Sequence, residues 1–127
     1  MVLAFLVSSD AEAPGRVRDV VRQHLRCALE ERIRYDLELL LTELVSNAVR
    51  HGSAEQGGEI AVRVELSETI VSVSITDPGE GFDAAELEPT PRTEAGGFGI
   101  LLLDRLSTRW GVERDGRGFR VWFKLRR

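Results

Sequence analysis

Two kinds of hydrophobic periodicity alternate along the chain. Apolar residues spaced three and four positions apart predict one helix from Pro14 to about Leu29 and another from about Arg32 to His51, where Gly52 ends it. Apolar runs and strict alternation predict strands. These strands are expected at residues 1–9, 60–66, 69–76, 107–114 and 118–125. The short links Ser67-Glu68 and DGRG (residues 115–118) predict that the last four strands form two antiparallel hairpins.

The stretch from Asp77 to Gly97 follows neither rhythm. It contains three of the four prolines, so we expect a long loop, followed by a short helix over the apolar run FGILLLDRL, residues 98–106. Ordered loops of this length are usually functional. The loop is therefore the first place to look for a site.

Composition narrows the class of protein. The 127 residues are 43% hydrophobic and 30% charged, which fits one globular domain over residues 1–127. A net charge of −4 argues against nucleic acid as a partner. The single cysteine, Cys27, can form no internal disulfide, which favours a reducing compartment, and we expect it to be buried on its helix. The apolar opening has no basic residue after Met1 and is too short for a membrane span, so we expect a cytoplasmic protein without membrane contact.

The second predicted helix carries polar residues beside its apolar stripe. In TELVSNAVRHG, residues 42–52, Glu43 and Asn47 lie one helical turn apart on one shoulder of the stripe, with Asp36 and Arg50 on the same shoulder. An amide oxygen is a hard ligand suited to Mg²⁺, and a carboxylate can accept a proton from an attacking hydroxyl. A solvent-exposed pair is the alternative at this point.

Two glycine-rich stretches follow. TDPGEGF, residues 76–82, places Asp77 at the end of an apolar strand before Gly79 and Gly81, which let a backbone approach a flat ligand. AGGFGI, residues 95–100, puts glycines directly before a helix, where free backbone N–H groups favour an anion. It lacks the Lys-Ser/Thr ending of a Walker A motif.

In this order the three stretches resemble the GHKL ATP-binding superfamily. ELVSNAVRHG is similar to its N box, DPGEGF to its G1 box and GGFGI to its G2 box. Within the superfamily the chain most resembles the small anti-sigma-factor serine/threonine kinases. The resemblance implies an α+β two-layer sandwich, in which helices cover one face of a mixed, mainly antiparallel sheet, with ATP and Mg²⁺ bound between the layers under a lid.

The resemblance also implies roles for single residues. Glu43 would be the general base, Asn47 the Mg²⁺ ligand and Asp77 the acceptor of a hydrogen bond from the adenine amino group. The other nucleotide-binding positions would be Gly79, Gly81, Gly97, Phe98 and Gly99, and the lid would run over residues 83–96, with Arg92 as a candidate partner of the terminal phosphate. Many relatives have Thr where this chain has Phe119, so adenine binding is expected to be weaker or differently organised.

The leading hypothesis is an ATP- and Mg²⁺-dependent serine/threonine kinase that phosphorylates an anti-anti-sigma (STAS) protein and sequesters a sigma factor, as a homodimer by resemblance. Arg18, Arg22 and Arg26 form a basic stripe on the first helix, either solvated or a docking surface for an acidic partner. One alternative is a non-catalytic module that acts only by sequestration. Another is a histidine-kinase-like domain acting in trans, which would form phosphohistidine. Trp110 and Trp122 are expected to be packing residues.

Overall fold

The computed structural model describes residues 1–52, 58–77, 99–115 and 118–127. Five strands form one sheet in the order β1-β2-β3-β5-β4, and each neighbouring pair is antiparallel. The strands are β1 (Val2–Ser8), β2 (Glu59–Leu66), β3 (Ile70–Asp77), β4 (Arg109–Asp115) and β5 (Gly118–Arg126). Alternation places the strands within one or two residues of the expected ranges, because one side chain in two faces the core.

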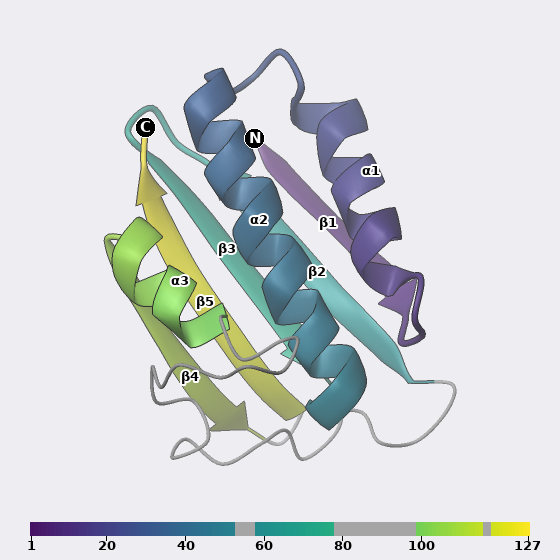
Figure 1. The fold of residues 1–127 in the computed structure, drawn as a ribbon. Helices are drawn as coiled ribbons and strands as arrows, with labels where there is room; N and C mark the ends of the chain where they lie inside the picture. The colour runs from purple at the N-terminus through teal and green to yellow at the C-terminus, as the bar shows by residue number, and fades with distance from the viewer. Residues whose placement is uncertain (53–57, 78–98, 116–117) are drawn as a thin grey trace.

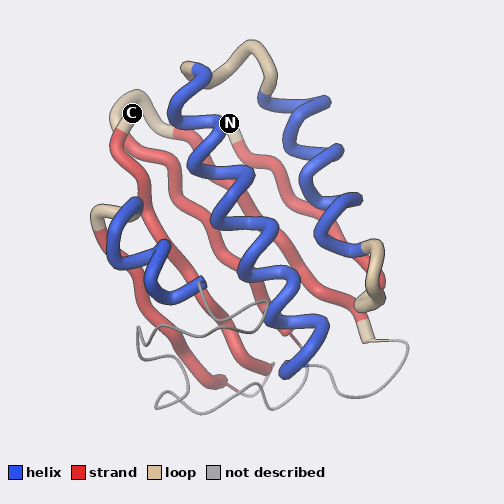
Figure 2. The backbone as a smooth tube through the Cα atoms, in the orientation of Figure 1, coloured by secondary structure: helices blue, strands red, loops and turns tan. Residues whose placement is uncertain are grey.

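The helices all cover one face of this sheet (Figure 1). They are α1 (Ala13–Leu25), α2 (Glu31–Asn47) and α3 (Gly99–Leu106). Figure 2 shows α2 between the other two, across the middle strands. The expected two-layer α+β sandwich is confirmed; the sheet was expected to be mixed and mainly antiparallel, and all the strand pairs that the structure describes are antiparallel. No helix of the described residues is long and apolar enough to cross a membrane.

The core lies between the two layers. The helices contribute buried residues at the predicted spacing, such as Val17 and Val21 on α1 and Leu37, Leu41 and Leu44 on α2. The sheet contributes the alternate positions of its strands, which on β2 and β3 include the residues Ile60, Val62, Val64, Val71, Val73 and Ile75. Burial of this apolar surface is the main free-energy term that holds the layers together.

Both helix ends depart from the sequence prediction. The first helix ends at Leu25 and not near Leu29, because the Ala28 N–H bonds the Leu25 carbonyl at 3.1 Å and tightens the chain into a turn. Leu29 still enters the core, which explains why it extends the apolar pattern. Cys27 lies in this turn and is exposed, so the prediction that it is buried on the helix was wrong.

The second helix changes character before its expected end. It is α-helical to Asn47 and continues as the π-helix η1 (Ala48–Gly52). The Ala48 N–H is shared between the carbonyls of Leu44 and Val45. Hydrophobic spacing cannot reveal this change, and π-helical turns are often found at functional sites.

The two tryptophans pack on opposite faces of the sheet. Trp110 on β4 packs against the core, and its indole N–H donates to Asp104 of α3 at 2.7 Å. Trp122 lies on the other face over Gly111, where an added Cβ would come within 2.7 Å of the ring. The expected packing role of both residues is therefore confirmed.

Candidate functional site

The polar residues of the first motif lie at the end of α2. Asn47 is 6% exposed, because its position on the helix follows the buried Leu44 by one turn, whereas Glu43 is half-buried. The motif was expected at the edge of the apolar stripe. In the structure its amide is buried and its carboxylate is half-buried. Asp36 is half-buried on the same side of the helix and Arg50 is exposed.

Asn47 has a neighbour that the sequence analysis did not identify as its partner. Arg50 Nη2 donates to Asn47 Oδ1 and to Ser46 Oγ, both at 3.3 Å. The amide oxygen proposed as a metal ligand therefore already accepts a hydrogen bond. It has a second lone pair, so the guanidinium weakens this oxygen as a ligand without blocking it. The three-residue spacing between Asn47 and Arg50 on one helix could have predicted this contact from the sequence.

Asp77 is the last residue of β3, not the first residue of a loop. It continues the alternation of Val71, Val73 and Ile75 toward the helices and is 2% exposed. Burying a carboxylate on an apolar strand is costly unless it accepts hydrogen bonds. This position therefore suits an acceptor for a ligand amino group.

Phe119 pairs with Asp77 across β3 and β5. It is 3% exposed, and the Arg114 guanidinium lies 5.4 Å from its ring centroid, within the range of a cation–π contact. The residue that replaces the expected Thr is thus a buried aromatic next to the proposed adenine acceptor. It packs in this position and offers no hydroxyl.

Figure 1 shows the end of α2, the end of β3 and the start of α3 on the same side of the molecule. Gly99 begins α3, as an anion site at a helix start requires. Gly79, Gly81, Gly97, Phe98, Arg92 and the rest of the expected lid lie outside the described residues, as does the side chain of His51. The structure therefore brings Asn47, Asp77 and Gly99 to one end of the fold, with Glu43 one turn away on α2.

The donor set fits magnesium only together with a nucleotide. Within the described ranges, no group of three or more His, Cys, Asp or Glu side chains could hold a metal ion. Mg²⁺ commonly takes one or two protein ligands and completes its shell with phosphates and water. A single amide oxygen at Asn47 is compatible with this arrangement.

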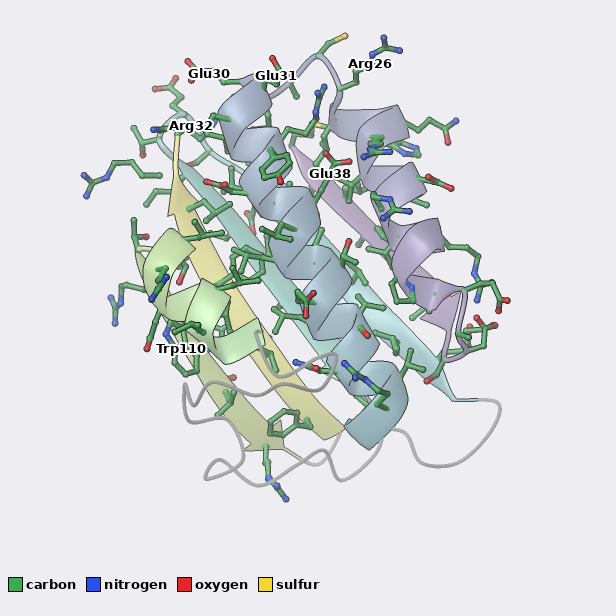
Figure 3. All side chains as sticks on the ribbon, viewed as in Figure 1. Arg26, Glu30, Glu31, Arg32, Glu38 and Trp110 are labelled. Atoms are coloured by element: carbon green, nitrogen blue, oxygen red, sulfur yellow. The ribbon has the colours of Figure 1, made fainter. Side chains whose placement is uncertain are left out.

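The other half of α2 contains a buried charge that the sequence analysis missed. Glu38 is 8% exposed and lies on the side of α2 that faces α1 (Figure 3). Its Oε1 accepts a hydrogen bond from Arg22 Nε of α1, and its Oε2 lies 3.8 Å from Arg34 Nε. Arg22 of the basic stripe is therefore an internal partner of α2. The sequence contained one indication of this ion pair. A glutamate occupies a position among the apolar residues of one helix, and the preceding helix is rich in arginine.

A shallow hollow of about 620 Å³ surrounds this ion pair on the outer side of α1 and α2. Arg26 and Tyr35 also line it, and Tyr35 is 66% exposed. The hollow combines an exposed aromatic ring with charged side chains of both signs, three arginines and the acidic residues Asp19, Glu31 and Glu38. Such a surface suits a protein partner better than a small molecule.

The sequence matches a known protein family and has curated relatives. The family described as the histidine kinase-like ATPase domain matches residues 7–125. The anti-sigma F factor of Lysinibacillus sphaericus is 31% identical over 121 residues, which cover 88% of this chain and 81% of that protein. The anti-sigma F factor of Clostridium acetobutylicum is 27% identical over 98% of this chain and 91% of that protein.

A kinase is also among the relatives. The serine-protein kinase RsbW of Oceanobacillus iheyensis is 30% identical over 82 residues, and the match spans only 52% of that protein. Among solved structures, the histidine kinase domain of the blue-light activated kinase EL346 of Erythrobacter litoralis gives a TM-score of 0.63 at 17% identity. It covers 94% of this chain and 61% of the other. At this identity the likeness is one of fold.

Proposed function

The chain belongs to the family of histidine kinase-like ATPase domains, and on this premise we propose that it is an ATP- and Mg²⁺-dependent serine/threonine protein kinase of the anti-sigma type. The observation that carries the proposal is the burial of two polar side chains, Asn47 at 6% and Asp77 at 2% exposure, at one end of an otherwise apolar core. A small number of polar groups that converge in an otherwise apolar setting is typical of ligand sites. That residues 1–127 form one such domain also stays a prediction.

Asp77, Asn47 and Gly99 would bind and orient the nucleotide. The Asp77 carboxylate would accept a hydrogen bond from the adenine amino group, and the backbone at Gly99 would donate to phosphate oxygens. Asn47 Oδ1 would hold Mg²⁺, which neutralises charge on the phosphates when it is bound. Gly79, Gly81, Gly97 and Phe98, which lie outside the described residues, complete the proposed site.

Glu43 would act on the attacking hydroxyl of the substrate protein. As the bond from the serine oxygen to the γ-phosphorus forms and the bond from phosphorus to ADP breaks, the Glu43 carboxylate would take the hydroxyl proton. Its half-buried position at the margin of the site leaves it accessible to a protein substrate. This access distinguishes its role from that of buried Asn47.

The proposed partners follow from the relatives. Two of them are named anti-sigma F factors, which supports a sigma factor as the sequestered partner, and one is named a serine-protein kinase. A serine of a STAS protein is the proposed phosphoryl acceptor. The hollow around Arg26 and Tyr35 is the surface we assign to such a partner. The homodimer that the resemblance implies is proposed as well.

Two observations favour the second candidate, a module that acts by sequestration without catalysis. Phe119 offers no hydroxyl beside Asp77, and Arg50 already donates to Asn47 Oδ1. We expect both features to make nucleotide binding weaker than in the family members that this chain resembles. The two candidates differ in whether phosphate reaches a partner protein.

Nucleotide binding is tested by thermal unfolding with ATP alone, Mg²⁺ alone and both. Ligand at roughly 100 times its dissociation constant stabilises the fold by about 2.7 kcal/mol, a shift of several degrees for a domain of this size. We expect the shift only when both are present. No shift at saturating nucleotide contradicts an ATP site.

Phosphoryl transfer is tested with γ-labelled ATP and a STAS protein from the same source. An acid-stable phosphoserine on the partner is the expected product. Label bound as ATP but never transferred favours the sequestration module, and acid-labile label indicates phosphohistidine.

A further inference from the structure

A hollow of about 240 Å³ lies at the end of the fold opposite the proposed nucleotide site. The start of α2, the end of α3 and the end of β5 border it, together with Thr108 between α3 and β4. Figure 1 shows these ends on the side of the molecule where the chain terminates. Asn47 and Asp77 lie at the other ends of α2 and β3. The hollow is therefore separate from the site already described.

Three arginines from three different elements line this hollow. They are Arg32 of α2, Arg105 of α3 and Arg126 at the last position of β5, and all three are exposed. Within the residues that the structure describes, none of their guanidinium groups has an ion-pair or hydrogen-bond partner. Other surface arginines do, such as Arg16 with Asp10. The positive charge at this hollow is therefore uncompensated, and such a charge attracts anions.

The neighbouring polar groups leave most of this charge in place. Asp36 is the only carboxylate residue among the described residues that line the hollow, so three positive charges and one negative charge leave a net charge of +2. Glu31, at the start of α2, lines the hollow between α1 and α2 instead. Thr108 Oγ1 donates to the Lys124 carbonyl at 3.1 Å, and the Arg127 guanidinium donates to two backbone carbonyls. The unpaired donors at the hollow are thus those of the three arginines.

The hollow also has apolar lining residues. Ile33 and Leu125 are 4% and 3% exposed, and Leu106 is half-buried. Ionic contacts beside apolar groups are stronger than in open water, because the effective dielectric constant is lower. An anion in the hollow would therefore be held more tightly than one on a flat charged surface.

The charge and the donors of the hollow suit a phosphate group. A guanidinium group can donate two parallel hydrogen bonds to phosphate or carboxylate oxygens. A phosphate monoester carries a charge of about −1.5 to −2 near neutral pH and offers three acceptor oxygens. This charge balances the +2 of the lining residues. A carboxylate carries one negative charge and two oxygens, so it would balance only half of it.

We infer that Arg32, Arg105 and Arg126 form a second anion site, which binds a phosphate dianion at the end of the fold opposite Asn47. We call these three residues the arginine cluster. Its ligand is either free inorganic phosphate or the phosphate group of a small organic monoester, since the arginines recognise the same dianion in both. The inference needs neither Mg²⁺ nor a nucleotide and is independent of the proposed function.

Phosphate binding is tested by titrating inorganic phosphate into the ¹⁵N-labelled chain and following its backbone amide resonances. Sodium chloride holds the ionic strength constant, because salt screens exposed charges, and the pH is kept well above the second pKa of a phosphate ester, about 6. We expect saturable shifts around Arg32, Arg105 and Arg126. Arg105→Gln should weaken the fitted affinity by about fivefold, as expected for one exposed ionic contact. Shifts that never saturate, or that lie elsewhere in the fold, overturn the inference.

Arg109→Gln is the matched control for the loss of one positive charge. Arg109 follows Thr108 in the chain but pairs with Lys124, which alternates with the buried residues Phe123 and Leu125, so it lies on the face of the sheet without helices. Its replacement should leave phosphate affinity unchanged, as should Asn47→Ala. Equal weakening by Arg105→Gln and Arg109→Gln would show general attraction of an anion and would overturn the site. Loss of binding in Asn47→Ala would place the phosphate in the proposed nucleotide site instead.

A second titration distinguishes the two sources of the phosphate group. Phenyl phosphate carries the same dianion on an apolar ring. Tighter binding of this ester than of inorganic phosphate would support an organic monoester that packs against Ile33, Leu106 and Leu125, and the reverse order would support the free ion. Acetate at the same ionic strength should bind more weakly than either. Acetate that binds as tightly as both contradicts the assignment to phosphate.

Discussion

Glu38 and Asn47 are both buried polar residues on α2, but their surroundings differ. The Glu38 carboxylate contacts two guanidinium groups, Arg22 from α1 and Arg34 from its own helix, so its charge is balanced within the fold. Asn47 lies where the α-helix becomes a π-helix, and its Oδ1 accepts a hydrogen bond from Arg50, which follows three residues later, at 3.3 Å. One end of the helix has a completed structural contact, and the other has a polar group available to a ligand.

This comparison separates two reasons for burying polarity. A buried charge that joins two helices should affect stability and leave ligand binding unchanged. A buried amide in a ligand site should do the reverse. Variants at the two ends of α2 can therefore test whether Glu38 serves stability and Asn47 serves ligand binding.

The largest expected effect is on catalysis at Glu43. Glu43→Gln keeps the shape of the side chain but cannot accept the hydroxyl proton, so phosphoryl transfer to the partner should fall by about 10²- to 10⁴-fold. Nucleotide binding should persist, since the residue is only half-buried at the margin of the site. Initial rates with labelled ATP measure the effect. Asp36→Asn, on the same side of α2, is the control; an equal loss there, or none at Glu43, refutes the assignment.

The next effect is the loss of nucleotide stabilisation at Asn47. Asn47→Ala removes the proposed Mg²⁺ ligand, so the gain of about 2.7 kcal/mol expected for wild type at roughly 100 times its dissociation constant should largely disappear. Thermal unfolding with and without ATP and Mg²⁺ measures it. Ser46→Ala also removes an Arg50 contact at 3.3 Å but should keep the full shift. Equal shifts in the two variants would place the metal elsewhere.

Glu38 should show the opposite behaviour. Glu38→Ala leaves Arg22 and Arg34 without their carboxylate, but Arg22 is 58% exposed and can be hydrated, so we expect a loss of about 1–2 kcal/mol in the free energy of unfolding. The additional shift with ATP and Mg²⁺ should match that of wild type. Urea unfolding measures the first quantity and thermal unfolding the second. A reduced nucleotide shift would show that the two ends of α2 are coupled.

The sequence predicted the layers better than the ends of their elements. Strand alternation and helical spacing report which side chains face the core, and Asp77 extends the apolar face of β3 by one position. They carry no information on the turn that ends α1 at Leu25 or on the change to a π-helix after Asn47, because backbone hydrogen bonds determine both. Helix and strand boundaries are therefore the least certain part of such a prediction.

The motifs predicted candidate residues for the site but not the side chains that surround them. Asn47 and Asp77 are buried at one end of the fold, in accordance with the motif order, although their roles remain proposals. Arg50 on Asn47 and the Arg114 contact with Phe119 arise from side-chain packing. Glu38 was missed because a carboxylate among leucines can be interpreted as part of a buried ion pair only when the neighbouring helix is known. Long-range partners of this kind are not visible in local patterns.

The smallest effect concerns an exposed ion pair, which contrasts with the buried one at Glu38. Asp10 precedes α1, and the hydrogen bond from Arg16 lowers the pKa of its carboxyl below the ordinary value of 3.8. A lowered pKa in the folded state stabilises the protein above the unfolded value, and this stabilisation is lost as the pH falls through the folded value. Asp10→Asn can keep the contact with the Glu12 N–H at 2.9 Å but loses the charge. Wild type should therefore be slightly more stable near neutral pH, and the difference should vanish once the pH has fallen below the lowered pKa of Asp10. Urea unfolding of both proteins across this range measures the difference, and a gap that persists in acid would assign the effect of Asp10 to the turn and not to its charge.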